Sequence, residues 1–173
     1  TLIGLQDDAD AAQPNKALYN TLQLLQDDDN SQVVIISGRP HPTLEAWFGK
    51  EQYFLVAEHG AWSNYPTHLW HSRAKLSTRW KFPVKHIMTK FANNTAGSII
   101  EEKSYSLAWH YRKAQAGLGQ LRATELSDSL RYLIQQHGLQ LLFVFIFIEV
   151  KNSELNKGKG AMNIVNSYKP DFI

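Results

Sequence analysis

A short, uninterrupted apolar run at residues 33–36 constrains the fold of this chain more than any other feature. The run is Val33-Val34-Ile35-Ile36, so every residue is β-branched, and Ser37-Gly38-Arg39-Pro40 follows it. A strand that is apolar on both faces is typical of a parallel sheet covered by helices on both sides. The run therefore predicts an α/β fold with this strand buried on both faces.

The neighbouring segments alternate between helix and strand. An amphipathic helix is expected after Pro14, with an apolar stripe made by Leu18, Leu22 and Leu25. Residues 42–48 predict a short helix, and residues 53–57 predict a second buried strand that ends at Glu58-His59-Gly60. This order of elements indicates an α/β core.

The second half of the chain has a different pattern. Residues 63–81 lose all periodicity and are expected to form a linker. Helices are predicted around residues 84–91 and 120–136, the second ending at Gly138, and strands at residues 99–100 and 104–111. The apolar run 141–148 contains no turn residue, which puts a hairpin there, and the placement of Glu149, in doubt. These elements indicate an α+β unit.

Composition excludes several classes of protein. The 173 residues include no cysteine, which excludes disulfide scaffolds, zinc fingers and thiol nucleophiles and fits a reducing, cytoplasmic location. The 18 basic and 16 acidic residues leave a net charge of +2, too little to indicate nucleic acid as a partner. Residues 1–8 lack the features of a signal peptide, and the longest apolar run, 141–148, is too short to span a membrane.

Three polar side chains are candidates for an anion site. Ser37 and His59 each follow a predicted parallel strand, where ligands bind in open α/β sheets. Lys157 lies in Asn156-Lys157-Gly158 at a predicted junction of loop and helix, where an ammonium can reach a phosphate. The alternatives are a turn serine, a structural histidine and a solvated lysine.

Residues 101–112 combine carboxylates, cations and aromatic rings. Carboxylates accept hydrogen bonds from sugar hydroxyls, and ring faces cover the C–H side of a sugar. The same residues would also fit an exposed antiparallel strand with a charged face. A stacking platform for single-stranded nucleic acid is a third reading, which the low net charge disfavours.

Several strings of residues, in order along nearly the whole chain, match one known family. They resemble the phosphatase domain of the trehalose-6-phosphate phosphatase family, in the haloacid dehalogenase-like superfamily. The resemblance is greatest to the phosphatase half of bifunctional synthase–phosphatase proteins. The matching strings are residues 34–39, 57–62, 97–103, 106–112, 149–150 and 156–158.

The resemblance implies a haloacid dehalogenase-like parallel-sheet core, residues 1–76 and 151–173, with an inserted α+β cap, residues 77–150. It implies Mg²⁺-dependent hydrolysis of trehalose 6-phosphate to trehalose and phosphate through an aspartyl-phosphate. A trehalose-phosphate synthase domain in the same parent chain is the implied partner.

The resemblance also implies roles for individual residues. Ser37 and Lys157 would hold the transferring phosphoryl group, and Thr1 would be the threonine of the family's DxDGT motif. Arg112 would lie near the phosphate or the cap entrance. The remaining expected substrate ligands are Arg39 and His59 in the core and Glu101, Lys103 and Glu149 in the cap.

The sequence departs from the family at its two ends. With Thr1 aligned to DxDGT, both catalytic aspartates lie upstream, and the acidic Gly-Asp-Asp motif lies beyond Ile173. We therefore expect these 173 residues alone to be nearly inactive and assign no metal ligand. Asp7, Asp8 and Asp10 fall in the following loop and are not expected to replace the aspartates. The alternative function is a non-catalytic regulatory or scaffold module of a trehalose-phosphate synthase.

Overall fold

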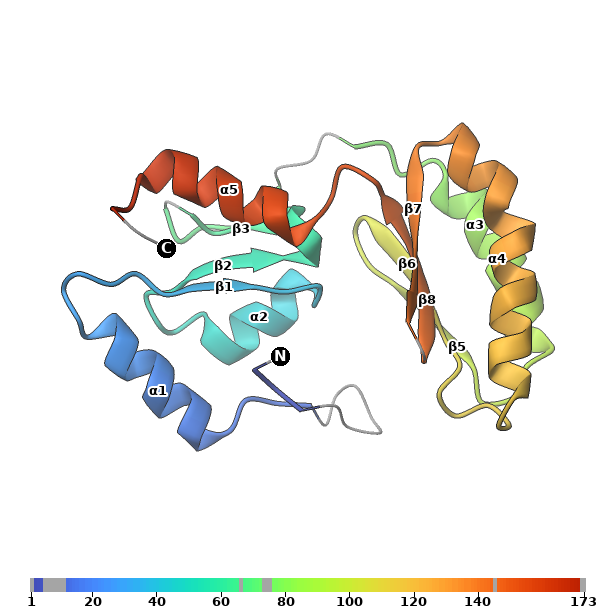
Figure 1. The fold of residues 1–173 in the computed structure, drawn as a ribbon, viewed down its shortest axis with the longest axis horizontal. Coiled ribbons are helices and arrows are strands. Elements are labelled where there is room, and N and C mark those ends of the chain that lie inside the picture. The colour runs from blue at the N-terminus through green and yellow to red at the C-terminus, as the bar shows by residue number, and fades with distance from the viewer. Residues whose placement is uncertain (1, 5–11, 66, 73–75, 145, 172–173) are drawn as a thin grey trace. The chain divides into compact units, whose positions relative to one another are not determined.

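The computed structural model describes residues 2–4, 12–65, 67–72, 76–144 and 146–171 (Figure 1). The chain divides into two compact units. Unit 1 comprises residues 1–74 and 156–173, and unit 2 comprises residues 75–155. Unit 2 includes residues 77–150, and their role as a cap stays a prediction. No helix in the described part of the chain is long and apolar enough to cross a membrane.

Unit 1 is built on a mixed sheet with the strand order β1-β2-β3-β4. β1 and β2 are parallel, with Ile35 opposite Leu55, and the other pairs are antiparallel. This partly parallel sheet with its helices agrees with the α/β core predicted from the sequence. Its elements are α1 (Lys16–Gln26), β1 (Val34–Ile36), α2 (His41–Phe48), β2 (Phe54–Ala57), the 3₁₀ turn η1 (Glu58–Gly60), β3 (Trp62–Ser63), β4 (His71–Ser72) and α5 (Lys157–Tyr168).

Burial in unit 1 differs in part from the expectation. Every residue of β2 is buried, but in β1 only Ile35 is, while Val34 and Ile36 are half-buried. In α1, Leu22 packs in the core, whereas Leu25 at the end of the predicted stripe is 51% exposed. The alternation of helix and strand is confirmed, but burial of the first strand on both faces is not.

The prediction of a linker at residues 63–81 is partly wrong. β3 begins at Trp62 and β4 lies at His71–Ser72, so an antiparallel hairpin extends the sheet of unit 1 within this segment. Further along, Trp80 is buried in the core of unit 2. Strands of two residues are too short to show a hydrophobic period, so this hairpin cannot be recognised in the sequence.

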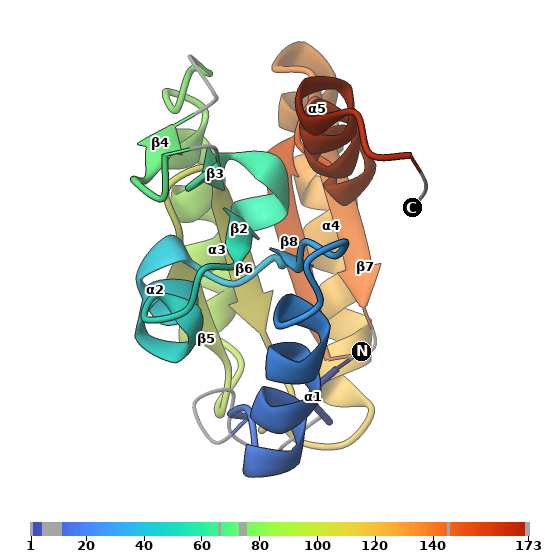
Figure 2. The same ribbon diagram turned by 90° about the vertical axis from the view of Figure 1, so that its left-hand side faces the viewer.

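Unit 2 is an antiparallel sheet with the order β5-β6-β8-β7 (Figures 1 and 2). α3 and α4 cover one face, where Trp109, Ile148 and Val150 of the strands meet Val84 and Leu126 of the helices. The other face carries the polar residues described below. The elements are α3 (Lys81–Asn93), β5 (Ile99–Glu102), β6 (Ser106–His110), α4 (Leu118–Gln136), β7 (Leu139–Val144) and β8 (Phe147–Asn152).

The apolar run 141–148 does form a hairpin, although it contains no turn residue. Val144 pairs with Phe147, so the β7–β8 connection is made by residue 145, which lies outside the described residues, and Ile146. Tyr111 makes two hydrogen bonds to this connection. Its N–H donates to the Ile146 carbonyl at 3.1 Å, and its hydroxyl donates to the Val144 carbonyl at 3.0 Å. A residue distant in sequence thus stabilises the turn.

Candidate functional site

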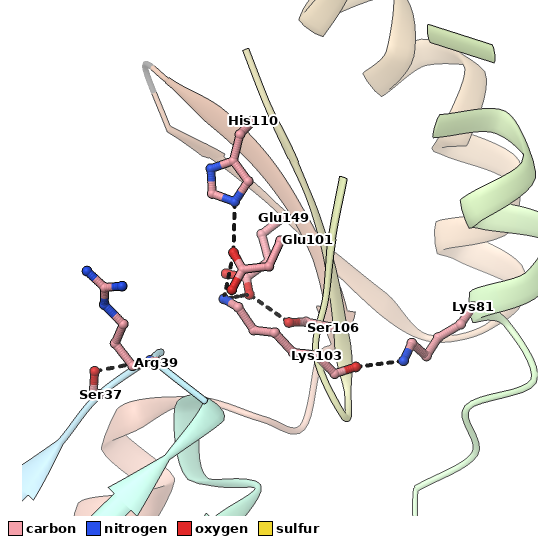
Figure 3. Close-up of polar contacts among 8 residues, drawn as sticks. All are labelled: Ser37, Arg39, Lys81, Glu101, Lys103, Ser106, His110 and Glu149. Carbon is pink, nitrogen blue, oxygen red and sulfur yellow. Dashed lines mark hydrogen bonds and ion pairs between the residues drawn. The ribbon is translucent and has the colours of Figure 1, made fainter. Parts of the chain in front are cut away.

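The loops after β1 and β2 are bonded to each other in unit 1. The His59 N–H donates to the Ser37 carbonyl at 3.0 Å, and the Glu58 N–H donates to the Arg39 carbonyl at 3.0 Å. The Ser37 hydroxyl oxygen accepts from the Arg39 N–H at 3.1 Å (Figure 3). The Arg39 guanidinium lies 5.2 Å from the ring centroid of Trp47, a cation–π contact. Ser37, Arg39 and His59 therefore lie together at the carboxyl end of the parallel strands.

The turn η1 has a strained backbone. Glu58 and His59 have φ values of +46° and +58°, in the left-handed region that few side chains adopt. The His59 ring lies against Gly38, where a Cβ would come within 2.7 Å of ring atoms Cε1 and Nε2. Glycine at position 38 is thus required for the ring to lie beside the β1 loop. Strain of this kind is common at ligand sites.

Lys157 comes to the same end of the sheet. It is the first residue of α5, which confirms the predicted junction of loop and helix at this position. The Asn156 side chain caps the helix by accepting from the Lys159 N–H at 2.7 Å. A Cβ on Gly160 would lie 3.4 Å from the Cα of Gly60, so the first turn of α5 packs directly on η1. The exposed Lys157 and the helix N-terminus both favour an anion.

Two glutamates lie in a row on the face of the unit 2 sheet opposite α3 and α4. Glu101 pairs with Ala108 of β6, and Ala108 pairs with Glu149 of β8. Lys103 lies between the carboxylates, with its Nζ 3.0 Å from Glu149 Oε1 and 3.9 Å from Glu101 Oε2 (Figure 3). The sheet thus brings together the three cap residues that the sequence predicted.

Neighbouring side chains fix the orientation of both carboxylates. The buried Ser106 hydroxyl donates to Glu149 Oε1 at 2.7 Å, and Glu149 itself is only 2% exposed. Nε2 of His110 lies 2.8 Å from Glu101 Oε2. The hydrogen bond with His110, and then the charge of Lys103, holds the pKa of Glu101 below its usual value.

The remaining expected site residues are Arg112 and Thr1. Arg112 is exposed in the turn after β6, and its role stays a prediction. Thr1 and the aspartates at positions 7, 8 and 10 lie outside the described residues. Sequence reasoning missed Ser106 and His110 as partners of the carboxylates. The alternation along residues 104–111 placed both on the same face as Ala108, but only the strand pairing shows which carboxylate each one meets.

The described residues contain no group of three or more histidine, aspartate or glutamate side chains that could hold a metal ion. Glu101 and Glu149, the carboxylates of the unit 2 row, are already bridged by the ammonium of Lys103. This donor set does not fit Mg²⁺, which prefers several oxygen ligands and water.

Comparisons with known proteins agree on one family. The sequence model of the trehalose-phosphatase family matches residues 1–172. A trehalose-phosphatase of Schizosaccharomyces pombe is 35% identical over 177 residues, covering 100% of this chain and 22% of its own length. A bifunctional trehalose-6-phosphate synthase/phosphatase of Thermoproteus tenax is 33% identical over 162 residues, covering 94% of this chain and 22% of its own length.

Solved structures confirm the haloacid dehalogenase-like fold that the sequence predicted. The C-terminal domain of the trehalose-6-phosphate phosphatase of Candida albicans is 32% identical with a TM-score of 0.91, over 95% of this chain and 58% of that one. A haloacid dehalogenase-like hydrolase of Bacillus subtilis shares the fold at 12% identity and a TM-score of 0.62, over 97% of this chain and 77% of that one. The chain spans about a fifth of the length of the curated relatives above (22% of each).

Proposed function

Because the chain belongs to the trehalose-phosphatase family, we propose that it is part of a phosphatase that hydrolyses trehalose 6-phosphate to trehalose and phosphate. The proposal concerns the activity of the whole protein, since the curated relatives are much longer than this chain. The observation that carries it is the packing of the α5 N-terminus on η1, which brings Lys157 beside the ends of β1 and β2.

The unit 1 group would bind the phosphoryl group. The Ser37 hydroxyl can donate to a phosphoryl oxygen, and Lys157 can neutralise the charge that develops on the transferring group. Arg39 and His59 lie at the same end of the sheet and would contact the substrate beside them. Donors held by backbone hydrogen bonds need little reorganisation during the reaction, which is why they lower its barrier.

The unit 2 row would bind the sugar. Glu101 and Glu149 can accept hydrogen bonds from neighbouring hydroxyls, while Lys103 donates to a hydroxyl oxygen. Ala108, whose side chain is a methyl group, pairs with both glutamates along the row. Arg112, in the turn after β6, would lie near the phosphate or the cap entrance.

The nucleophile and cofactor are proposed from the family resemblance alone. An aspartate of the DxDGT motif, with Thr1 as its threonine, would form the aspartyl-phosphate. Mg²⁺, when bound, would neutralise phosphate charge. No described residue is assigned to the metal.

Phosphate release from trehalose 6-phosphate by the whole protein tests the proposal. Lys157→Ala should lower kcat/KM by about 100-fold, because it removes a cation from the transferring group. Lys159→Ala removes an exposed lysine from the same helical turn and should change kcat/KM less than about twofold. Equal effects of the two variants, or no release by the unaltered protein, would refute the assignment.

A regulatory module of a trehalose-phosphate synthase is the second candidate. Two Arabidopsis thaliana relatives, 32% and 30% identical, are named probable trehalose-phosphate synthases. A synthase domain in the same parent chain is the proposed partner. We also propose a cytoplasmic location, because the lack of cysteine fits a reducing compartment. Binding of trehalose 6-phosphate without phosphate release, together with altered synthase activity, would favour this candidate.

A further inference from the structure

We propose that Lys81 is a positioning residue for sugar recognition, acting through Lys103. Lys81 is the first residue of α3, on the helical side of unit 2, and the sequence gives no sign that it has a functional role. The inference rests on the proposed function, in which Lys103 donates to a sugar hydroxyl. It adds to that function a residue that holds the donor in place.

Lys81 reaches from α3 to the connection between β5 and β6 (Figure 3). Its ammonium donates to the Lys103 carbonyl at 2.6 Å and lies 3.5 Å from the Ser104 carbonyl. It also forms an ion pair with Glu102 Oε1 at 2.7 Å, and its side chain is only 13% exposed. One ammonium thus contacts three consecutive residues, the last of β5 and the first two of the connection.

These contacts offset an unfavourable position for a cation. The N-terminus of a helix carries partial positive charge, so a lysine in the first turn is disfavoured. The preceding residue, Trp80, is buried in the core of unit 2 and anchors the start of α3. The Glu102 carboxylate and the two carbonyls supply the negative charge that keeps the Lys81 ammonium in this place.

The contacts of Lys81 restrict the backbone from which Lys103 projects. The Lys103 N–H donates to the Ser106 carbonyl at 3.0 Å, while the Lys103 carbonyl accepts from Lys81. Both backbone polar groups of Lys103 are therefore held, and its side chain extends to Glu149 at 3.0 Å. A lysine loses much conformational entropy when it binds a ligand, and fixing its backbone beforehand reduces that cost.

Lys85 provides a matched control. It lies one helical turn further along α3 and pairs with the other oxygen of the same carboxylate, Glu102 Oε2, at 2.7 Å. Its side chain is 50% exposed. Lys81→Met and Lys85→Met each remove one cation from Glu102, but only Lys81→Met removes the donor to the Lys103 carbonyl.

Trehalose and inorganic phosphate are the probes, each titrated into the whole protein and followed by NMR. Lys81→Met should weaken trehalose binding about tenfold and leave phosphate binding unchanged, because it removes a charge-assisted hydrogen bond next to the sugar group only. Lys85→Met should change both affinities less than about twofold. In a Lys103→Ala background, Lys81→Met should weaken trehalose binding no further, because Lys81 acts through Lys103.

Equal weakening by Lys81→Met and Lys85→Met, or an additive loss with Lys103→Ala, would overturn the positioning role alone. If the unaltered protein binds phosphate but not trehalose, the sugar assignment of unit 2 fails, and this proposal fails with it. Binding of neither probe would overturn the proposed function as a whole. Should Lys81→Met not fold, Lys81→Gln, whose shorter side chain does not reach the carbonyl, carries the same expectation.

Discussion

Replacing Lys103 with methionine should destabilise unit 2 strongly, because it removes the cation between Glu101 and Glu149. The side chains of Lys103 and Glu149 are only 10% and 3% exposed, and the two are joined at 3.0 Å. Coulomb's law with an effective dielectric constant of about 20 gives roughly 5 kcal/mol for a pair at this separation. Part of that attraction is offset by the desolvation that both groups undergo on folding. We therefore expect the free energy of unfolding to fall by about 3–5 kcal/mol, as is usual when one partner of a buried ion pair is removed.

The assay is urea unfolding at pH 7 and pH 4, with hydrogen exchange of the β6 and β8 amides to report on unit 2 itself. The loss should be smaller at pH 4, because the carboxylates left without their cation are then protonated to a greater extent. Lys85→Met breaks an exposed pair and should cost less than about 1 kcal/mol. A loss below about 1 kcal/mol for Lys103→Met at pH 7, or an equal loss at pH 4, would refute the reasoning.

Two further predictions concern a glycine and a carboxylate of unit 2. Gly97→Ala should lower the free energy of unfolding by about 3 kcal/mol or more, because φ is +83° and a Cβ would collide with the Lys113 carbonyl oxygen. Gly117→Ala, at φ +80° with no atom within 4 Å of the Cβ, should cost about 1 kcal/mol, and equal melting temperatures for the two variants would contradict this. The hydrogen bond with His110 holds the pKa of Glu101 below its usual value, so the stabilisation by ionised Glu101 is present above that usual pKa and lost as the pH falls through the lowered pKa. Glu101→Gln should therefore destabilise at pH 6 and much less at pH 3, and urea midpoints that differ equally at both pH values would argue against it.

The regular elements of the fold could be predicted where they were long or strongly patterned. The helix predicted over residues 120–136 is α4, and the β-branched run at residues 33–36 marks the strand that pairs in parallel with β2. The β3–β4 hairpin and the β7–β8 turn could not be predicted. The first consists of strands of two residues, and the second is stabilised by Tyr111, which is far away in the sequence.

The candidate site divides in the same way. The spacing of Ser37 and His59 after their strands was sufficient to expect them together, because parallel strands end at one edge of a sheet. The hydrogen-bond partners of the cap carboxylates could not be predicted from the sequence. Whether Ser106 meets Glu101 or Glu149 depends on the order β5-β6-β8-β7, in which β8 pairs with β6 although α4 and β7 separate them in the chain.

Local patterns of the sequence determined the fold class, the family resemblance and the types of residue available for binding an anion and a sugar. Such properties depend on neighbouring residues and on spacing, which the sequence contains directly. The tertiary structure alone decided that Lys81 of α3 holds the turn of Lys103, and that Ser106 and Lys103 share one oxygen of Glu149. These contacts join residues 22, 43 and 46 positions apart, and only the pairing of strands and the packing of a helix on the sheet bring them within hydrogen-bond distance.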